Sequence, residues 1–234
     1  MTKPTDDRGG IIRRRIGPLL AVFAAVLATA CFDIEHRVTI AADGSGEVRL
    51  SLETDNVLPE GTRIDTILSG PDGRTEVHEY TENGRFFHVE TARFAALNEL
   101  ALQDDEMTVS VRDRALWGAG PARATFRRTV RPIGDGGDSF GLVQRLLTDR
   151  TYSFSVTLPG WIDEIEAVRI DDLEAVPQRD GNTITWRIPL GLFARADTVT
   201  FTVHFNTFGD LKSSGTRPVT DAPESVSPLL GRPG

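Results

Sequence analysis

The chain has 234 residues, with 26 Lys and Arg against 34 Asp and Glu, and its formal net charge at pH 7 is −8. This acidic balance argues against a nucleic-acid-binding protein, and the content of 39% apolar and 26% charged residues argues against both a disordered chain and a polytopic membrane protein. The single cysteine excludes a disulfide scaffold and a cysteine-rich zinc site.

Residues 1–30 are expected to be a lipoprotein signal peptide. Three arginines, Arg13 to Arg15, precede an apolar run from Ile16 to Ala30 that is shorter than the roughly 20 residues a membrane-spanning helix needs. Small residues end the run directly before Cys31. This order resembles a bacterial lipobox, which implies cleavage before Cys31 and diacylation of its thiol. The alternative is a buried core cysteine behind an ordinary signal or a membrane anchor.

Alternating apolar and polar residues predict half-buried antiparallel strands through most of residues 31–208. Glycine-containing turns predict three hairpins. They join 34–40 to 48–52 through 43–46, 77–80 to 86–90 through Asn83-Gly84, and 174–178 to 183–188 through Asp180-Gly181. Further strands are expected over 107–111, 124–126, 152–158 and 199–205. Trp186 is expected in the core because it shares its parity with Ile184 and Ile188.

Three stretches have apolar residues at helical spacing, namely 56–68, 94–102 and 139–147. We therefore expect an α+β domain over 31–208, a mostly antiparallel β-sheet with two or three short covering helices; a second sheet is the alternative cover. From Gly209 to Gly234 the chain is rich in Pro, Ser, Thr and Gly without an apolar period. We expect this tail to be disordered.

A family resemblance rests on the segments that follow the cysteine. The turn Asp43–Glu47 (DGSGE), the triplet Leu158-Pro159-Gly160 and the later run from Asp180 to Leu190 (DGNTITWRIPL) occur in this order. The order resembles that of bacterial envelope lipoproteins with an LppM-like domain. The resemblance implies an α+β envelope domain without known catalytic residues, and a lipid or glycolipid as its ligand.

The search for catalytic and metal-binding motifs is negative. The sequence has no GxSxG elbow, no Walker loop and no HExxH helix, so we expect neither an enzyme nor a cofactor. All four histidines are expected to be ordinary structural or surface residues, and His88 and His204 are the pair that lies near the middle of predicted strands. The acidic residues between Asp163 and Glu174 lack the spacing of a calcium loop, so no metal is expected.

A basic stretch around Trp117 is the sharpest functional feature. It holds six arginines: Arg112, Arg114, Arg123, Arg127, Arg128 and Arg131. Guanidinium groups bind phosphates or carboxylates through paired hydrogen bonds, and a Trp at a loop tip suits a lipid headgroup layer or a partner's pocket. The alternative is a hairpin whose arginines pair with neighbouring carboxylates while Trp117 folds onto the core.

These features favour a non-enzymatic envelope lipoprotein, anchored on the extracytoplasmic face of a membrane by its N-terminal diacylglycerol. Its predicted partner is an anionic lipid, a glycolipid or an acidic protein. An envelope assembly or structural accessory is the second hypothesis. A hydrolase is the third, and it requires His88 or His204 beside a serine and a carboxylate in a cleft.

Overall fold

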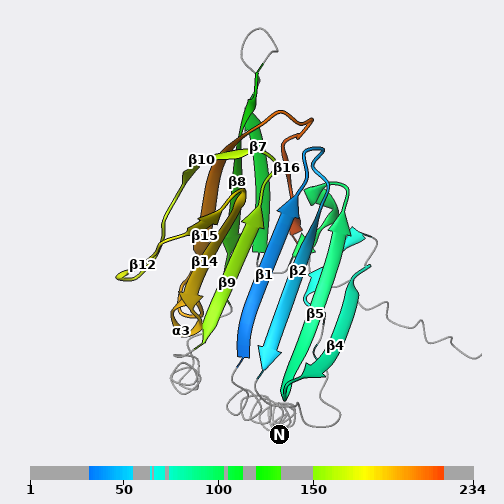
Figure 1. Ribbon diagram of the computed structural model, residues 1–234, viewed down its shortest axis with the longest axis vertical. Helices are drawn as coiled ribbons and strands as arrows, with labels where there is room; N and C mark the ends of the chain where they lie inside the picture. Colours follow the sequence, from blue (N-terminus) through cyan, green and yellow to red (C-terminus); the bar gives the residue numbers. More distant parts are fainter. Residues whose placement is uncertain are drawn as a thin grey trace, which may run out of the picture.

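The computed structural model describes residues 32–54, 64, 66–71, 74–102, 105–112, 120–132 and 150–218. Two sheets contain most of its strands (Figure 1). The seven-stranded sheet has the order β13-β14-β9-β1-β2-β5-β4, with β13 at Gln178–Asp180, β14 at Thr183–Pro189, β9 at Thr151–Thr157, β1 at Phe32–Ile40, β2 at Gly46–Thr54, β5 at Arg85–Phe94 and β4 at Glu76–Glu82. The five-stranded sheet has the order β10-β15-β8-β7-β16, with β10 at Trp161–Ile165, β15 at Val199–Thr207, β8 at Ala122–Val130, β7 at Asp105–Arg112 and β16 at Ser214–Gly215.

Smaller elements lie beside the two sheets. β11 (Val168–Ile170) pairs with β12 (Leu173–Ala175), and β6 (Ala101–Leu102) lies between β17 (Arg217–Pro218) and β3 (Leu68–Ser69). The helical elements bounded within the described residues are the 3₁₀ turn η3 (Leu97–Glu99) and the four-residue helix α3 (Leu190–Phe193).

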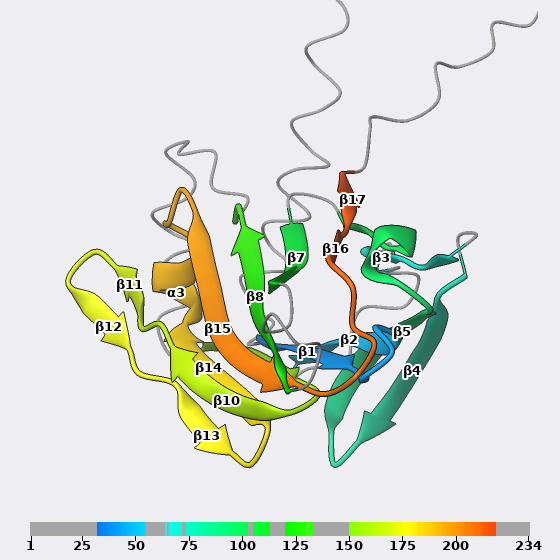
Figure 2. The same cartoon turned by 90° about the horizontal axis from the view of Figure 1, so that it is seen from above.

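The predicted α+β class is therefore wrong, and the protein is mostly β-sheet. Of the three predicted helices, 94–102 is the end of β5 followed by η3 and β6. The described part of 56–68 ends in β3, and 139–147 lies outside the described residues. The cover of the seven-stranded sheet is a second sheet, as Figure 2 shows end-on. A sheet with one apolar face needs an apolar partner, and the alternating strands β7, β8 and β15 supply it.

The core between the sheets is filled by aromatic rings. The centroid of Phe154 on β9 lies 4.7 Å from that of Phe201 on β15 and 5.7 Å from that of Trp186 on β14. All three side chains are fully buried, as predicted for Trp186. These contacts join the two sheets at their centre, and the aromatic side chains fill the space between them.

The hairpins follow the predicted turns with one change. β1 pairs with β2, and β4 pairs with β5 through Asn83 and Gly84, which both have positive φ as a two-residue type I′ turn requires. The third hairpin is shorter than predicted, because only β13 pairs with β14 and residues 173–175 pair with β11. β9 also pairs with β1 in a parallel direction, which the sequence pattern did not indicate.

Residues 209–218, the first ten of the predicted disordered tail, include two short strands. β16 pairs with β7, and β17 pairs with β6. Leu211 is buried, and Ser213 Oγ accepts a hydrogen bond from the backbone N–H of Val111 at 2.8 Å. Residues 219–234 lie outside the described residues.

Candidate contact surface on the five-stranded sheet

Three of the predicted arginines share the outer face of the five-stranded sheet. Arg123 and Arg127 alternate along β8 with Ala124 and Phe126, which point into the core. Arg112 at the end of β7 lies directly opposite Arg123 in the antiparallel register. All three arginines are exposed, so the sheet presents a basic row to solvent. We call Arg112, Arg123 and Arg127 the arginine row.

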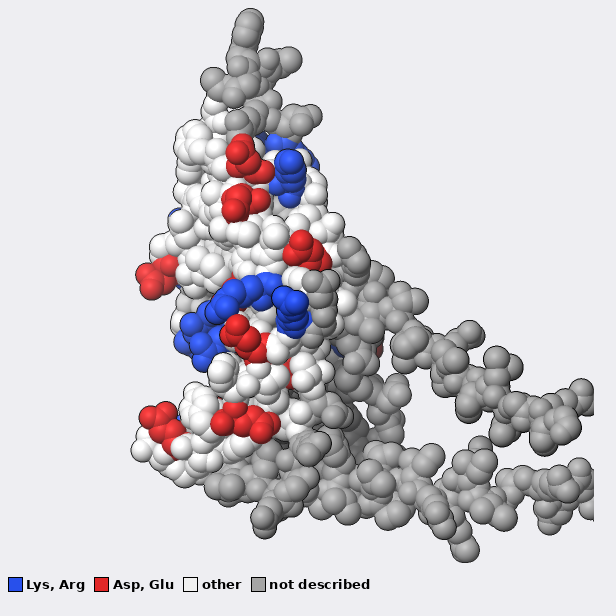
Figure 3. Space-filling view, turned by 90° about the vertical axis from the view of Figure 1, so that its right-hand side faces the viewer, with Lys and Arg blue, Asp and Glu red and all other residues white. Residues whose placement is uncertain are grey.

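The arginine row has no acidic partners within the described ranges. On the seven-stranded sheet, by comparison, Arg93 contacts both Glu47 and Glu76, at 3.2 and 3.1 Å. Figure 3 shows the molecule from the side of β4 and β5, where acidic and basic side chains lie close together. Like charges directly opposite each other on neighbouring strands are destabilising. The pair Arg112 and Arg123 therefore carries a cost that a bound anion would remove.

Arg128 does not belong to this surface, although it was predicted there. It points into the core and is 2% exposed. Its Nε atom donates to Asp105 at 3.0 Å, and its Nη1 atom donates to the hydroxyl of Tyr152 at 2.7 Å. The guanidinium carbon also lies 4.4 Å from the ring centre of Phe154. Arg128 thus joins the two sheets through a buried, paired charge.

His36 completes this buried cluster. Its Nδ1 atom accepts a hydrogen bond from Arg128 Nη2, and its Nε2 atom has no hydrogen-bond partner among the described residues. Burial and the neighbouring Arg128 charge hold the pKa of His36 well below its usual range. Burial raises the pKa of Tyr152 to about 12. Both rings are therefore neutral at pH 7, and the carboxylate that balances the charge of Arg128 among the described residues is Asp105.

Of the remaining predicted site residues, the structure describes only Arg131. Arg131 is exposed but follows β8 at the end remote from Arg123. Arg114, Trp117 and Cys31 lie outside the described residues.

An exposed aromatic pair, which the sequence reasoning missed, lies next to Arg123. Trp161 begins β10, is 43% exposed and packs against Phe208, which is 67% exposed, with ring centres 5.4 Å apart. Trp161 lies opposite Asn206 on β15, and Asn206 lies opposite Arg123 on β8. The signal in the sequence is a tryptophan directly after Pro159-Gly160 and before an acidic stretch.

Gly160 fixes the position of Trp161. Its φ is +129°, and a Cβ atom at this position would lie 2.0 Å from the carbonyl oxygen of Asn206. Only glycine allows β10 to approach β15 this closely. The chain therefore enters β10 with Trp161 in register with Asn206.

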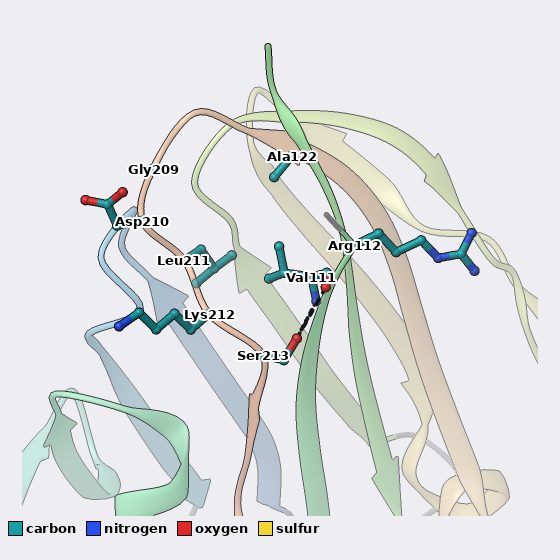
Figure 4. Close-up of a pocket in the computed structure, with 8 residues that line it drawn as sticks. All are labelled: Val111, Arg112, Ala122, Gly209, Asp210, Leu211, Lys212 and Ser213. Atoms are coloured by element: carbon teal, nitrogen blue, oxygen red, sulfur yellow. Dashed lines mark hydrogen bonds between the residues drawn. The ribbon is translucent and has the colours of Figure 1, made fainter. Parts of the chain in front are cut away.

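A shallow pocket of about 520 Å³ lies near Arg112, between the end of β7 and residues 209–213 (Figure 4). Val111, Ala122 and Leu211 supply its apolar atoms. Figure 4 shows that the guanidinium group of Arg112 points away from Leu211 and Lys212. Arg112 is among the residues that line this pocket, although its guanidinium group extends away from the segment 209–213.

The histidines are separated from one another. His88 is buried on β5 between Glu79 and Glu90, whereas His204 on β15 contacts Thr125 at 2.9 Å and Glu166 at 3.4 Å. Neither of the two described pockets is lined by a histidine. His78 is exposed on β4.

The described residues contain no group of three or more His, Cys, Asp or Glu side chains arranged to hold a metal ion. They also contain no helix that is long and apolar enough to cross a membrane.

Comparison with solved structures finds a distant structural neighbour. No protein-family model and no curated protein matches the chain. Among solved structures, the chain is similar to the folded domain of LppM from Mycobacterium tuberculosis, determined by NMR. The TM-score is 0.41 and the sequence identity is 10%, over 76% of this chain and 90% of that domain.

Proposed function

We propose that the protein is a non-enzymatic lipoprotein of the bacterial cell envelope. It is tethered through a diacylated Cys31, and it binds an anionic partner with the outer face of the five-stranded sheet. The observation that carries the binding role is the arginine row, three exposed guanidinium groups with no ion pair to another described residue. Such groups bind phosphate or carboxylate oxygens through paired hydrogen bonds.

The packed interior favours surface contact over enclosure of a ligand. Phe154, Phe201 and Trp186 occupy the centre between the sheets, where a bound acyl chain would otherwise lie. The two described pockets are open and are bordered in part by charged side chains. A partner of this protein therefore meets the outer surface of a sheet.

The start of β1 supports the tether. β1 begins at Phe32, one residue after Cys31, so a lipid on Cys31 would hold the folded domain at the bilayer without a spacer. Two acyl chains anchor a protein stably, because each buried methylene contributes about 0.8 kcal/mol.

The tether is tested by metabolic labelling of cells with palmitate. The wild-type protein should incorporate label and lose residues 1–30, whereas Cys31→Ala should remain unlabelled and uncleaved. An equal label on Cys31→Ala would overturn the lipoprotein assignment.

The binding role is tested separately with two anionic probes. These are phosphatidylglycerol-containing vesicles and a fluorescent copolymer of glutamate and tyrosine, with phosphatidylcholine vesicles as the neutral reference. The triple variant Arg112→Glu, Arg123→Glu, Arg127→Glu should lose binding to whichever probe the wild type binds. Arg49→Glu is the matched control, because Arg49 is exposed on the outer face of the other sheet. Absence of wild-type binding to both probes, or equal loss in the control, would refute the role.

A further inference from the structure

We propose that one end of the outer face of the five-stranded sheet docks a protein partner. This partner presents carboxylates beside an apolar pocket. The docking residues are Trp161, Phe208, Arg123 and Arg112, which we call the distal rung. This inference deepens the proposed function, because it names the partner class and the part of the surface that meets it.

The distal rung is continuous across four neighbouring strands. Trp161 on β10 lies opposite Asn206 on β15, Asn206 lies opposite Arg123 on β8, and Arg123 lies opposite Arg112 on β7. Neighbouring strands lie about 4.8 Å apart, so the distal rung spans about 15 Å across its four strands. Phe208 follows β15 and packs on Trp161. Aromatic and cationic groups thus lie along one strip of the outer face.

The composition of the distal rung is that of a protein contact. Trp, Phe and Arg are enriched at protein–protein interfaces, and Trp and Arg dominate their binding energy. Trp161 and Phe208 expose large apolar rings to solvent. The two arginines beside them have no carboxylate partner within the described residues, so a partner's carboxylates would meet unpaired guanidinium groups while its apolar atoms cover the rings.

The location of the distal rung argues against the anchoring membrane as its partner. β1 begins next to Cys31 and runs toward the end of the sandwich that holds the distal rung (Figure 1). Gly209, directly after Phe208, lies against Ala42, which follows the end of β1. Nine residues of strand extend about 30 Å, which exceeds the Debye length of about 8 Å at physiological ionic strength. The tether and the distal rung therefore lie at opposite ends of the sandwich.

The test uses the lipidated full chain in phosphatidylcholine nanodiscs and the glutamate–tyrosine copolymer, which carries carboxylates and aromatic rings. Binding is followed by fluorescence anisotropy. Arg112→Glu with Arg123→Glu, and separately Trp161→Ala, should each weaken binding about tenfold or more, the effect expected of an interface hot spot. The matched controls are Arg49→Glu and Tyr80→Ala. Tyr80 is 44% exposed and stacked on Phe87, as Trp161 is 43% exposed and packed on Phe208.

Three outcomes would overturn the inference. The first is that Trp161→Ala binds the copolymer as tightly as the wild type. The second is that the distal-rung variants lose binding to phosphatidylglycerol vesicles but keep binding to the copolymer. That result would identify a lipid surface as the partner. The third is that the wild type sediments as a dimer and the double variant Arg112→Glu, Arg123→Glu sediments as a monomer. That result would identify a second copy of this chain as the partner. Unaltered palmitate labelling of Cys31→Ala is a separate failure of the tether and leaves the copolymer result unchanged.

Discussion

The carboxylate of Glu90 lies 2.9 Å from Nε2 of His88, and both side chains are buried on the inner face of β5. Glu90 also accepts hydrogen bonds from the backbone N–H groups of Ile67, at 2.9 Å, and Leu68, at 2.7 Å. One carboxylate therefore holds the segment that leads into β3 against the seven-stranded sheet.

The variant Glu90→Gln should lower the free energy of unfolding by about 1.5–3 kcal/mol, because its neutral amide replaces a charged acceptor of buried hydrogen bonds. Chemical denaturation in urea measures this change. Glu79→Gln is the matched control, since Glu79 contacts the other ring nitrogen of His88 but is 49% exposed, and its loss should cost less than about 1 kcal/mol. Equal costs for the two variants would contradict a special role for the buried carboxylate.

Arg128→Met should destabilise the protein by about 3–5 kcal/mol, because it leaves Asp105 without its buried counter-charge. Adding Asp105→Asn should restore part of that loss, which a double-mutant cycle measures. The neighbouring change Arg127→Met should alter stability by no more than about 0.5 kcal/mol, because Arg127 faces solvent. A large effect of Arg127→Met with a small one of Arg128→Met would contradict the assigned facing of β8.

The stability of the protein should fall at acidic pH through His36. Its folded-state pKa is depressed by burial and by Arg128, so the unfolded chain binds the proton more tightly. The contribution is fully present above the unfolded pKa of about 6.5 and is lost as pH falls, with a slope approaching 1.4 kcal/mol per pH unit. Urea unfolding of wild type and His36→Asn between about pH 5 and pH 8 measures this slope. His36→Asn should lose it while the exposed-residue control His78→Asn keeps it, and the same slope in both variants would assign the effect elsewhere.

Gly160→Ala should lower the free energy of unfolding by about 1–3 kcal/mol more than Gly120→Ala does. Both glycines have nearly the same backbone angle, with φ of +129° and +127°, so the intrinsic strain of alanine is matched. Only at Gly160 would the added methyl group meet a neighbouring backbone, that of Asn206. Thermal unfolding of the two variants gives the comparison, and equal losses would show that the close approach of β10 to β15 is unimportant.

Local turn chemistry and strand parity were readable from the sequence. Asn83 and Gly84 adopt the positive φ angles that their dipeptide predicts, and Trp186 is buried between the strands as its parity with Ile184 indicates. These features depend on near neighbours in the chain, so a single sequence contains the information that determines them.

The class of the fold was not readable in the same way. Leu97 and Leu100 are buried, as their spacing required, but the short segment that holds them is a 3₁₀ turn between strands. A few apolar residues at helical spacing do not distinguish a helix from such a turn. Pairing between distant strands decided the outcome.

The candidate site was predicted in part. The row of arginines was found from charge density, but charge density does not tell which arginine faces the core. Arg128 shares its parity with Ala124 and Phe126, so strict alternation along β8 would have placed it inside. Trp161 was missed because its exposure depends on its register with β15, a strand that begins more than thirty residues later.

The parallel pairing of β1 and β9 affects how the chain reaches its native state. Asp33 accepts a hydrogen bond from the backbone N–H of Thr151, 118 residues away in sequence. Contacts of such high sequence separation slow folding, because the chain loses the entropy of closing a long loop before these contacts can stabilise it. β1 cannot pair with β9 until most of the polypeptide has been made. A chain that passes through a translocation channel from its N-terminus would therefore remain unfolded during passage.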